Sequence, residues 1–271
     1  MSDSAAPDIK AKNRAMWASG DYATVAADLI SAFGPTLVAA TGIKPGDRVL
    51  DIGAGSGNAS IPAARTGADV IASDLTPELL EKGRKQAESE GLTLEWRVAD
   101  AEALPFGDDE FDVAISCVGI MFAPHHHESA DELVRVLRPG GSIGLINWTP
   151  EGFIGQMFGV MKPYAPPPPP GAQPALLWGS EEHVAALFGD RVTDVVARRQ
   201  TITIDMFSTA AEFRDFFKSF YGPTISVYSF IGDDAERAAS LDRELADLAV
   251  RHGVGSGPME WEYLLYTAKK A

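Results

Sequence analysis

The chain has 271 residues, with 45% hydrophobic and 9% aromatic residues, and it is long enough to bury a sizeable core. A formal net charge of −15, from 38 acidic and 23 basic residues, disfavours binding to nucleic acid or to anionic lipid. No run approaches the roughly 20 apolar residues of a membrane helix, and the polar stretch 1–12 lacks a secretory signal. Together with a single cysteine, Cys117, these features predict a cytoplasmic protein, monomeric or homodimeric, that acts on a small molecule.

Strand and helix patterns alternate through the first half of the chain. Thr76 is a good N-cap and Pro77 suits a first helical turn, so a helix begins there. Strands separated by helices at this pitch predict a parallel, doubly wound sheet. The predicted strands are 48–54, 69–75, 94–98, 111–117 and 142–148, and the predicted helices are 58–66, 77–90 and 129–137.

The second half is less regular, and it contains five consecutive prolines at 166–170. That stretch excludes a helix or a central strand and predicts a stiff surface loop or a lid wall in polyproline conformation. Around it, the patterns predict helices at 181–188, 209–221 and 233–252 and strands at 195–206 and 261–267.

A glycine-rich loop follows the first predicted strand, with the pattern Asp51-x-Gly53-x-Gly55-x-Gly57. Glycines let a loop turn tightly and approach a ligand closely. In the dinucleotide-binding fingerprint a third glycine would stand where this chain has Asn58 or Ser60. The loop therefore argues against a nicotinamide dinucleotide, and we expect Asp51 to order the loop by accepting hydrogen bonds from its amides.

This loop resembles the first signature of the class I S-adenosylmethionine-dependent methyltransferases, a hydrophobic strand followed by Asp/Glu-x-Gly-x-Gly-x-Gly. Further signatures follow in order: Asp74 at the end of the second strand, Asp-Ala-Glu-Ala-Leu-Pro-Phe at 100–106, the segment 111–114, and Arg-Val-Leu-Arg-Pro-Gly-Gly at 135–141. The last segment and the Leu-Pro-Phe motif are similar to the type 11 branch, which includes ubiquinone and menaquinone C-methyltransferases and many small-molecule enzymes. The resemblance covers roughly residues 45–150.

The resemblance implies an α/β fold with a doubly wound seven-stranded sheet, mostly parallel with an antiparallel last strand, and a helical cap. We expect an N-terminal helical lid at 1–40 and a cofactor-binding core at 41–150. The cap is expected from 151–190 and 207–255, and the strands that complete the sheet from 191–206 and 256–271.

The cofactor implied by the resemblance is S-adenosylmethionine, with S-adenosylhomocysteine as product. In the family, an acid at the position of Asp74 binds the ribose hydroxyls and one at Asp100 meets the adenine amine. Trp17 and Tyr22 either face the sulfonium, which an aromatic ring attracts, or anchor a helix to the core. Glu102 is expected to face solvent and Cys117 to be a small packing residue. The residues expected to bind the cofactor are Trp17, Tyr22, Gly53, Ala54, Gly55, Asp74, Leu75, Asp100, Ala101, Glu102 and Cys117.

Methyl transfer from a sulfonium needs alignment and exclusion of water, and it needs a base only if the nucleophile holds its proton tightly. His126 and His127, which follow the fourth strand, are the candidate catalytic bases. The alternative is that they form the first turn of a helix and face solvent. No metal site is expected, since adjacent histidines point apart.

The substrate is expected to be a small apolar or aromatic molecule, because the cap is rich in large apolar side chains. They are Phe153, Met157, Phe158, Met161, Tyr164, Trp178, Phe217, Tyr221 and Tyr228. Many of them must be ordinary core residues, and the sequence does not separate the two groups. Two other functions stay open: a methyltransferase-like protein with a non-methylating reaction, and an NAD-dependent oxidoreductase. The missing third glycine and the lack of an obvious Tyr-Lys pair disfavour the oxidoreductase.

Overall fold

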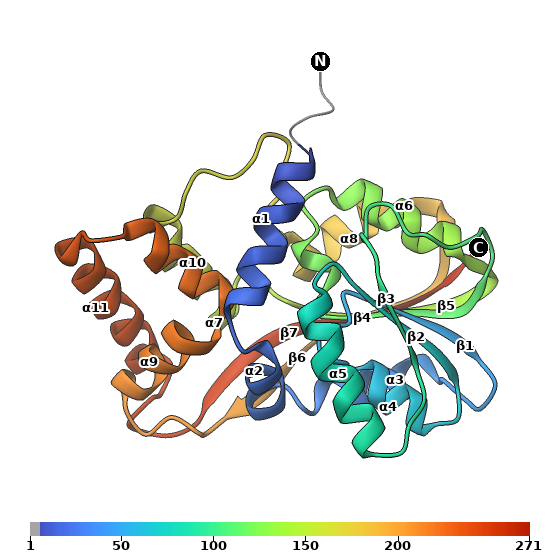
Figure 1. The fold of residues 1–271 in the computed structure, drawn as a ribbon, viewed down its shortest axis with the longest axis horizontal. Coiled ribbons are helices and arrows are strands. Elements are labelled where there is room, and N and C mark those ends of the chain that lie inside the picture. The colour runs from blue at the N-terminus through green and yellow to red at the C-terminus, as the bar shows by residue number, and fades with distance from the viewer. Residues whose placement is uncertain (1–5) are drawn as a thin grey trace.

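The computed structural model describes residues 6–271, so residues 1–5 of the expected lid lie outside the described part (Figure 1). Within that range the strands form one seven-stranded sheet in the order β3-β2-β1-β4-β5-β7-β6. The strands are β1 (Arg48–Ile52), β2 (Asp69–Asp74), β3 (Glu95–Val98), β4 (Phe111–Cys117), β5 (Leu137–Trp148), β6 (Val192–Ile204) and β7 (Met259–Lys270). Strands β1 to β5 pair in parallel, and β7 runs antiparallel between β5 and β6. This topology confirms the expected fold class.

Helices cover both faces of the sheet. In the view of Figure 1, α3, α4 and α5 lie below it and α6 and α8 above it, while α9, α10 and α11 gather at one end of the molecule. The helices are α1 (Ala6–Ser19), α2 (Tyr22–Leu29), α3 (Phe33–Thr41), α4 (Ser60–Arg65), α5 (Pro77–Ser89), α6 (His126–Val136), α7 (Phe153–Met161), α8 (Glu181–Phe188), α9 (Ala210–Phe220), α10 (Gly222–Ile231) and α11 (Ala235–Arg251). Within residues 6–271 no single helix passes a length and hydropathy test for crossing a membrane, although the bent pair α2 and α3 passes it jointly.

Local capping explains several helix boundaries. Helix α9 begins at a capping box, in which Thr209 accepts from the Glu212 amide and the Glu212 carboxylate accepts from the Thr209 amide. The Ser180 side chain caps α8 in the same way, by accepting from the backbone of His183. Both helices therefore begin within one residue of the predicted position.

Helices α7 and α10 were not predicted. Helix α7 is apolar almost throughout, with Phe153, Ile154, Met157 and Met161 buried, so no polar face marks it as a helix. Helix α10 begins at Gly222, two residues after the last residue of α9, so no loop sequence marks the boundary between the two helices. Because its side chains are almost all apolar, α7 lacks an amphipathic pattern, and the same composition explains why most of it is buried in the protein interior.

The proline segment 166–170 is exposed and irregular, as a surface loop requires. Of the large apolar side chains named for the cap, the structure places four in the core: Phe153, Met157, Met161 and Trp178 are each at most 3% exposed. Their role is to pack the cap helices against the sheet.

Candidate functional site

A cavity lies at the carboxyl ends of β1, β2 and β4, where open α/β sheets bind their ligands. Its empty volume, including space that is open to solvent, is about 770 Å³. Of the residues expected to bind a cofactor, those in its wall are Trp17, Tyr22, Gly53, Gly55, Asp74, Leu75, Asp100 and Ala101. Ala54, Glu102 and Cys117 are not part of the wall.

The glycine loop and the loop after β4 touch through their backbones. Gly53 has φ +68°, and a Cβ added to it would lie 2.8 Å from the Cα of Gly119. Conversely, a Cβ on Gly119 would lie 2.2 Å from the Gly53 carbonyl oxygen. Both residues line the cavity. The sequence did not predict Gly119 as a site residue. The one signal for it was its position two residues after β4, a strand that ends at the site.

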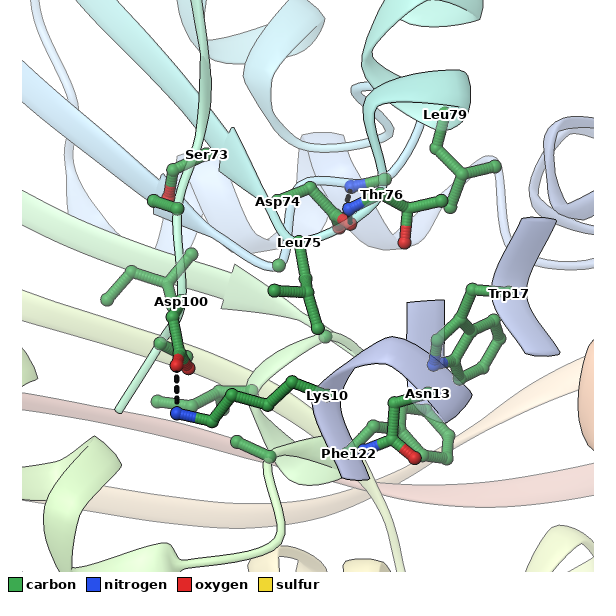
Figure 2. A pocket seen from close by; sticks show the side chains of 18 of the residues that line it. Lys10, Asn13, Trp17, Ser73, Asp74, Leu75, Thr76, Leu79, Asp100 and Phe122 are labelled. Atoms are coloured by element: carbon green, nitrogen blue, oxygen red, sulfur yellow. Dashed lines mark hydrogen bonds and ion pairs between the residues drawn. The ribbon is translucent and has the colours of Figure 1, made fainter. Parts of the chain in front are cut away.

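Asp74 ties the glycine loop to the start of α5. One carboxylate oxygen accepts from the Gly55 amide at 2.8 Å, and the other accepts from the Thr76 amide at 2.8 Å. Burial raises the pKa of this carboxyl, and the two amides oppose that shift. Figure 2 shows Asp74 beside Thr76 on the cavity wall. The residue thus holds the loop in place and also faces the cavity.

Asp51 lies beneath the loop, 1% exposed. One carboxylate oxygen accepts from the Ser60 hydroxyl at 2.5 Å, while the other has no hydrogen-bond partner among residues 9–271. Burial raises the pKa of Asp51 to about 7. The expectation that Asp51 binds the amides of the glycine loop is therefore wrong, because its partner is Ser60 at the start of α4.

Lys10 closes the far end of the cavity. Figure 2 shows its side chain extending from α1 to Asp100, and the ammonium also lies 3.3 Å from Glu102 Oε2. Burial lowers the pKa of Lys10, but the Asp100 and Glu102 carboxylates outweigh it and the net shift is upward. Lys10 is 90 residues from Asp100 in the sequence, so no local pattern could predict the pair.

Glu102 is not solvent-facing as expected. Its side chain is 6% exposed and accepts from the His125 amide at 2.8 Å, and its carboxylate lies 3.1 Å from His125 Nδ1. The other oxygen of Asp100 accepts from the Glu102 amide at 3.0 Å. Glu102 thus supports the Asp100 turn from behind the cavity wall.

The rings of Trp17 and Tyr22 meet edge to face, with centroids 5.4 Å apart, and both line the cavity. Trp17 also packs against Phe122 and Tyr221, at 4.6 and 6.1 Å. The Tyr22 ring lies against the glycine loop, 3.6 Å from where a Gly55 Cβ would be. The two functions considered for these rings, anchoring a helix and facing a ligand, are therefore compatible.

Cys117 is buried at the end of β4, with its sulfur 3.6 Å from the Asn58 side-chain nitrogen. Burial raises the pKa of the thiol, so it stays protonated near neutral pH. Its packing is that of a small core residue behind the wall. Among the described side chains, those of residues 9–271, the structure contains no group of three or more His, Cys, Asp or Glu placed to hold a metal.

The two candidate base histidines do not line the cavity. His126 is fully buried, with Nδ1 2.9 Å from His183 Nε2 and its ring 5.6 Å from the Trp178 ring. His127 is exposed on α6. Burial, and then the nearby His183, lower the pKa of His126 to about 4. The geometry therefore gives neither imidazole access to a reacting atom in this cavity.

The buried His126 predicts a pH dependence of stability. Its folded pKa of about 4 is below the ordinary 6.5, so between these values the unfolded chain binds a proton that the folded chain excludes. This contribution is complete above pH 6.5 and is lost as the pH falls towards 4. Between pH 7 and 5, urea unfolding should show the wild type losing about 2 kcal/mol more than His126→Gln. The exposed His127→Gln is the control and should keep the wild-type slope; an unchanged slope in His126→Gln would contradict the assignment.

The comparisons with known proteins agree with this geometry. The family described as "Methyltransferase domain" matches residues 49–141. An uncharacterized protein of Mycobacterium tuberculosis (strain H37Rv) is 54% identical over 262 residues, which cover 97% of this chain and 95% of that protein. The demethylmenaquinone methyltransferase of Clavibacter sepedonicus is 41% identical over 98 residues, 36% of this chain and 40% of that enzyme.

Among solved structures, YcgJ from Bacillus subtilis shares the fold with a TM-score of 0.60 and 17% identity, covering 88% of this chain and 98% of that one. A geranyl diphosphate methyltransferase in complex with SAM has a TM-score of 0.53 and 18% identity, covering 89% of this chain and 85% of that one. Given the matched domain, the methyltransferase relative and the sheet order, the chain belongs to the class I S-adenosylmethionine-dependent methyltransferases.

Proposed function

We propose that the enzyme binds S-adenosylmethionine in the cavity above β1, β2 and β4 and transfers its methyl group to a small apolar or aromatic molecule. The observation that carries this proposal is that one cavity wall combines Gly53, Gly55, Asp74, Asp100 and Ala101. These residues come from three separate segments, and the family resemblance assigns Asp74 to the ribose and Asp100 to the adenine of the cofactor.

The residues present fit this cofactor. Asp74 would accept from the ribose hydroxyls and Asp100 from the adenine amine, with Leu75 and Ala101 beside them as apolar walls. At the glycine loop, Gly53 lets the backbone pack against Gly119, and Gly55 keeps the wall below the Tyr22 ring free of a side chain. The aromatic ring of Tyr22 lies on that loop, where it would face a sulfonium cation.

When bound, the cofactor supplies an activated methyl group, so the protein's part is to align and to exclude water. Trp17 and Tyr22 cover the glycine-loop end of the cavity from α1 and α2. The ionisable side chains in the cavity wall are those of Lys10, Tyr22, Asp74 and Asp100. Burial raises the pKa of the Tyr22 hydroxyl well above its ordinary value, so it serves as a hydrogen-bond donor rather than as a base. We therefore expect an acceptor atom that is nucleophilic enough to take the methyl group without first being deprotonated by a strong base.

The remaining parts of the proposal rest on the chain's composition and fold. The net charge of −15 supports a small-molecule acceptor over nucleic acid or membrane, in a cytoplasmic monomer or homodimer. We propose that α1 and α2 form the lid and that the segments 151–190 and 207–255 form the substrate cap.

Calorimetric titration tests the cofactor. S-adenosylhomocysteine should bind the full-length chain, and NAD should give no heat; binding of NAD without S-adenosylhomocysteine would overturn the proposal. The acceptor is then sought by incubating the enzyme with a metabolite mixture and methyl-labelled cofactor. A product heavier by one labelled methyl group supports the transfer, whereas tight cofactor binding without any product would favour the non-methylating alternative.

Lys10→Met should strengthen cofactor binding, because both oxygens of Asp100 are engaged by Lys10 and by the Glu102 amide. An adenine amine must displace the ammonium, and a partly exposed ion pair is worth up to about 1 kcal/mol, so the gain should be roughly two- to fivefold at low salt. Calorimetry with S-adenosylhomocysteine measures it. Lys85→Met, on the outer face of α5, is the matched control. Weaker binding by Lys10→Met would mean that the ammonium contributes to the site instead of competing with it.

A further inference from the structure

A single buried hydroxyl group joins two of the loops that form the wall of the cavity. Ser116, near the end of β4, is 0% exposed, and its hydroxyl donates to the Ile52 carbonyl oxygen at 2.5 Å. The same hydroxyl oxygen accepts from the Ile120 amide at 2.8 Å. Ile52 ends β1, Ile120 follows β4, and both residues line the cavity. One side chain therefore fixes the distance between the loop after β1 and the loop after β4.

The backbone of the loop after β4 is strained. Val118 has φ +55°, in the left-handed region that β-branched residues rarely adopt. Among residues 6–271, the other two non-glycine residues with positive φ are Asp109 and Asp194, and aspartate tolerates this conformation better than valine does. Of these three residues, only Val118 lines the cavity. Such strain persists only where the surrounding contacts hold the backbone in place.

Two hydrogen bonds on either side of the strain hold this backbone. The Val118 amide donates to the Ile146 carbonyl oxygen of β5 at 2.8 Å, and the Ser116 hydroxyl binds the amide of Ile120, two residues further on. Between these bonds lies Gly119, where a side chain would collide with the glycine loop. Without the Ser116 hydroxyl, Val118 would relax towards a negative φ. Gly119 would then move away from the glycine loop.

The order of the strands indicates which part of the cofactor this loop serves. Asp100 follows β3 and Asp74 ends β2, and the family resemblance assigns them to the adenine and the ribose. The sheet continues from β2 to β1 and then to β4, with about 4.8 Å between neighbouring strands. The loops after β1 and β4 therefore lie beyond the ribose. The sulfur-bearing amino-acid chain of the cofactor would extend in that direction.

We propose that Ser116 is a positioning residue for the amino-acid half of the cofactor. Its hydroxyl holds Val118 in the left-handed conformation and so keeps Gly119 against the glycine loop. Because Ser116 is fully buried and is not part of the cavity wall, it acts through the backbone of the two loops. This inference rests on the proposed function, since the ligand is the cofactor named there.

Calorimetric titration of the full-length protein with S-adenosylhomocysteine and with adenosine tests the inference. Adenosine has the adenine and the ribose but lacks the amino-acid chain. Ser116→Ala should weaken the binding of S-adenosylhomocysteine about tenfold and that of adenosine by less than about threefold. Ser116→Cys keeps the bulk of the side chain but forms weaker hydrogen bonds, so it should show the same selective loss and serves if Ser116→Ala does not fold.

The chain offers a matched control for the hydroxyl group. Ser129 is equally buried, and its hydroxyl donates to the His125 carbonyl oxygen at 3.0 Å. Neither of these residues lines the cavity. Ser129→Ala should therefore leave the affinities for S-adenosylhomocysteine and adenosine unchanged, although it also removes a buried hydrogen bond.

A second background tests the strain itself. Glycine adopts a positive φ without steric cost, so in Val118→Gly the loop should keep its conformation without the hydroxyl. Adding Ser116→Ala to Val118→Gly should then weaken S-adenosylhomocysteine binding by less than about threefold relative to Val118→Gly alone. An equal loss in both backgrounds would show that the hydroxyl does not hold Val118, and it would overturn the inference.

Two other results would also contradict the role of Ser116. One is an unchanged affinity for S-adenosylhomocysteine in both Ser116→Ala and Ser116→Cys. The other is an equal loss for S-adenosylhomocysteine and adenosine, which would indicate general damage to the cavity. In both cases the wild type still binds S-adenosylhomocysteine, so only the assignment of Ser116 is wrong. If the wild type does not bind S-adenosylhomocysteine at all, the proposed function fails and this inference fails with it.

Discussion

Gly119→Ala is expected to weaken the binding of S-adenosylhomocysteine at least tenfold, about 1.4 kcal/mol, because the added methyl group forces apart two loops that form the cavity wall. The added methyl group would lie 2.2 Å from the Gly53 carbonyl oxygen, closer than any real contact. The neighbouring atoms belong to backbone, which cannot rotate away as a side chain would. The glycine loop and the loop after β4 must therefore separate, and both form the cavity wall.

Calorimetry measures the affinity, and urea unfolding separates a local effect from a global one. Gly159→Ala is the control, because a Cβ there meets no atom within 4 Å and the residue lies within helix α7. That variant should bind the cofactor normally and be slightly stabilised, as alanine is the better helix former. Cofactor affinity of Gly119→Ala within threefold of wild type would show that the two loops can part without cost to the site.

The cavity residues that could be predicted from the sequence are those within short local motifs. The glycine pattern and Asp100 follow strands and Asp74 ends one, each at a characteristic spacing, and strands of a parallel sheet end at one edge. Lys10 and Gly119 reach the same cavity with no such marker. Lys10 comes from α1, a helix 90 residues away from Asp100 in the sequence, and Gly119 matters because another backbone lies against it.

The expectations that proved wrong share one physical cause. They concern polar side chains that distant parts of the chain bury, and no local sequence pattern encodes that burial. Glu102 and His126 are polar and were expected in or near solvent or the site, yet both are buried by elements distant in the sequence. His126 is covered by Trp178 and paired with His183 on α8, 57 residues away. Polar residues that pair with each other in the interior are indistinguishable, in one sequence, from polar residues that await a ligand.

Asp74→Ala is expected to weaken S-adenosylhomocysteine binding at least tenfold, about 1.4 kcal/mol. Two effects combine. The variant loses the carboxylate that would accept from the ribose, and it leaves the Gly55 and Thr76 amides without their acceptor. The second effect also lowers the free energy of unfolding, by about 1–3 kcal/mol. Asp69→Ala, at the exposed opposite end of β2, should change neither quantity appreciably.

A ligand series separates the two effects of Asp74. Wild type should bind adenosine more tightly than 2′,3′-dideoxyadenosine, because only adenosine offers ribose hydroxyls to the carboxylate. In Asp74→Ala that difference should vanish, whereas damage to the loop alone would weaken both ligands equally and keep the difference. A preserved preference for adenosine would therefore confine Asp74 to holding Gly55 and Thr76, and the ribose would have to be assigned to another group in the wall. A lost preference would establish that one carboxylate both shapes the glycine loop and binds the sugar.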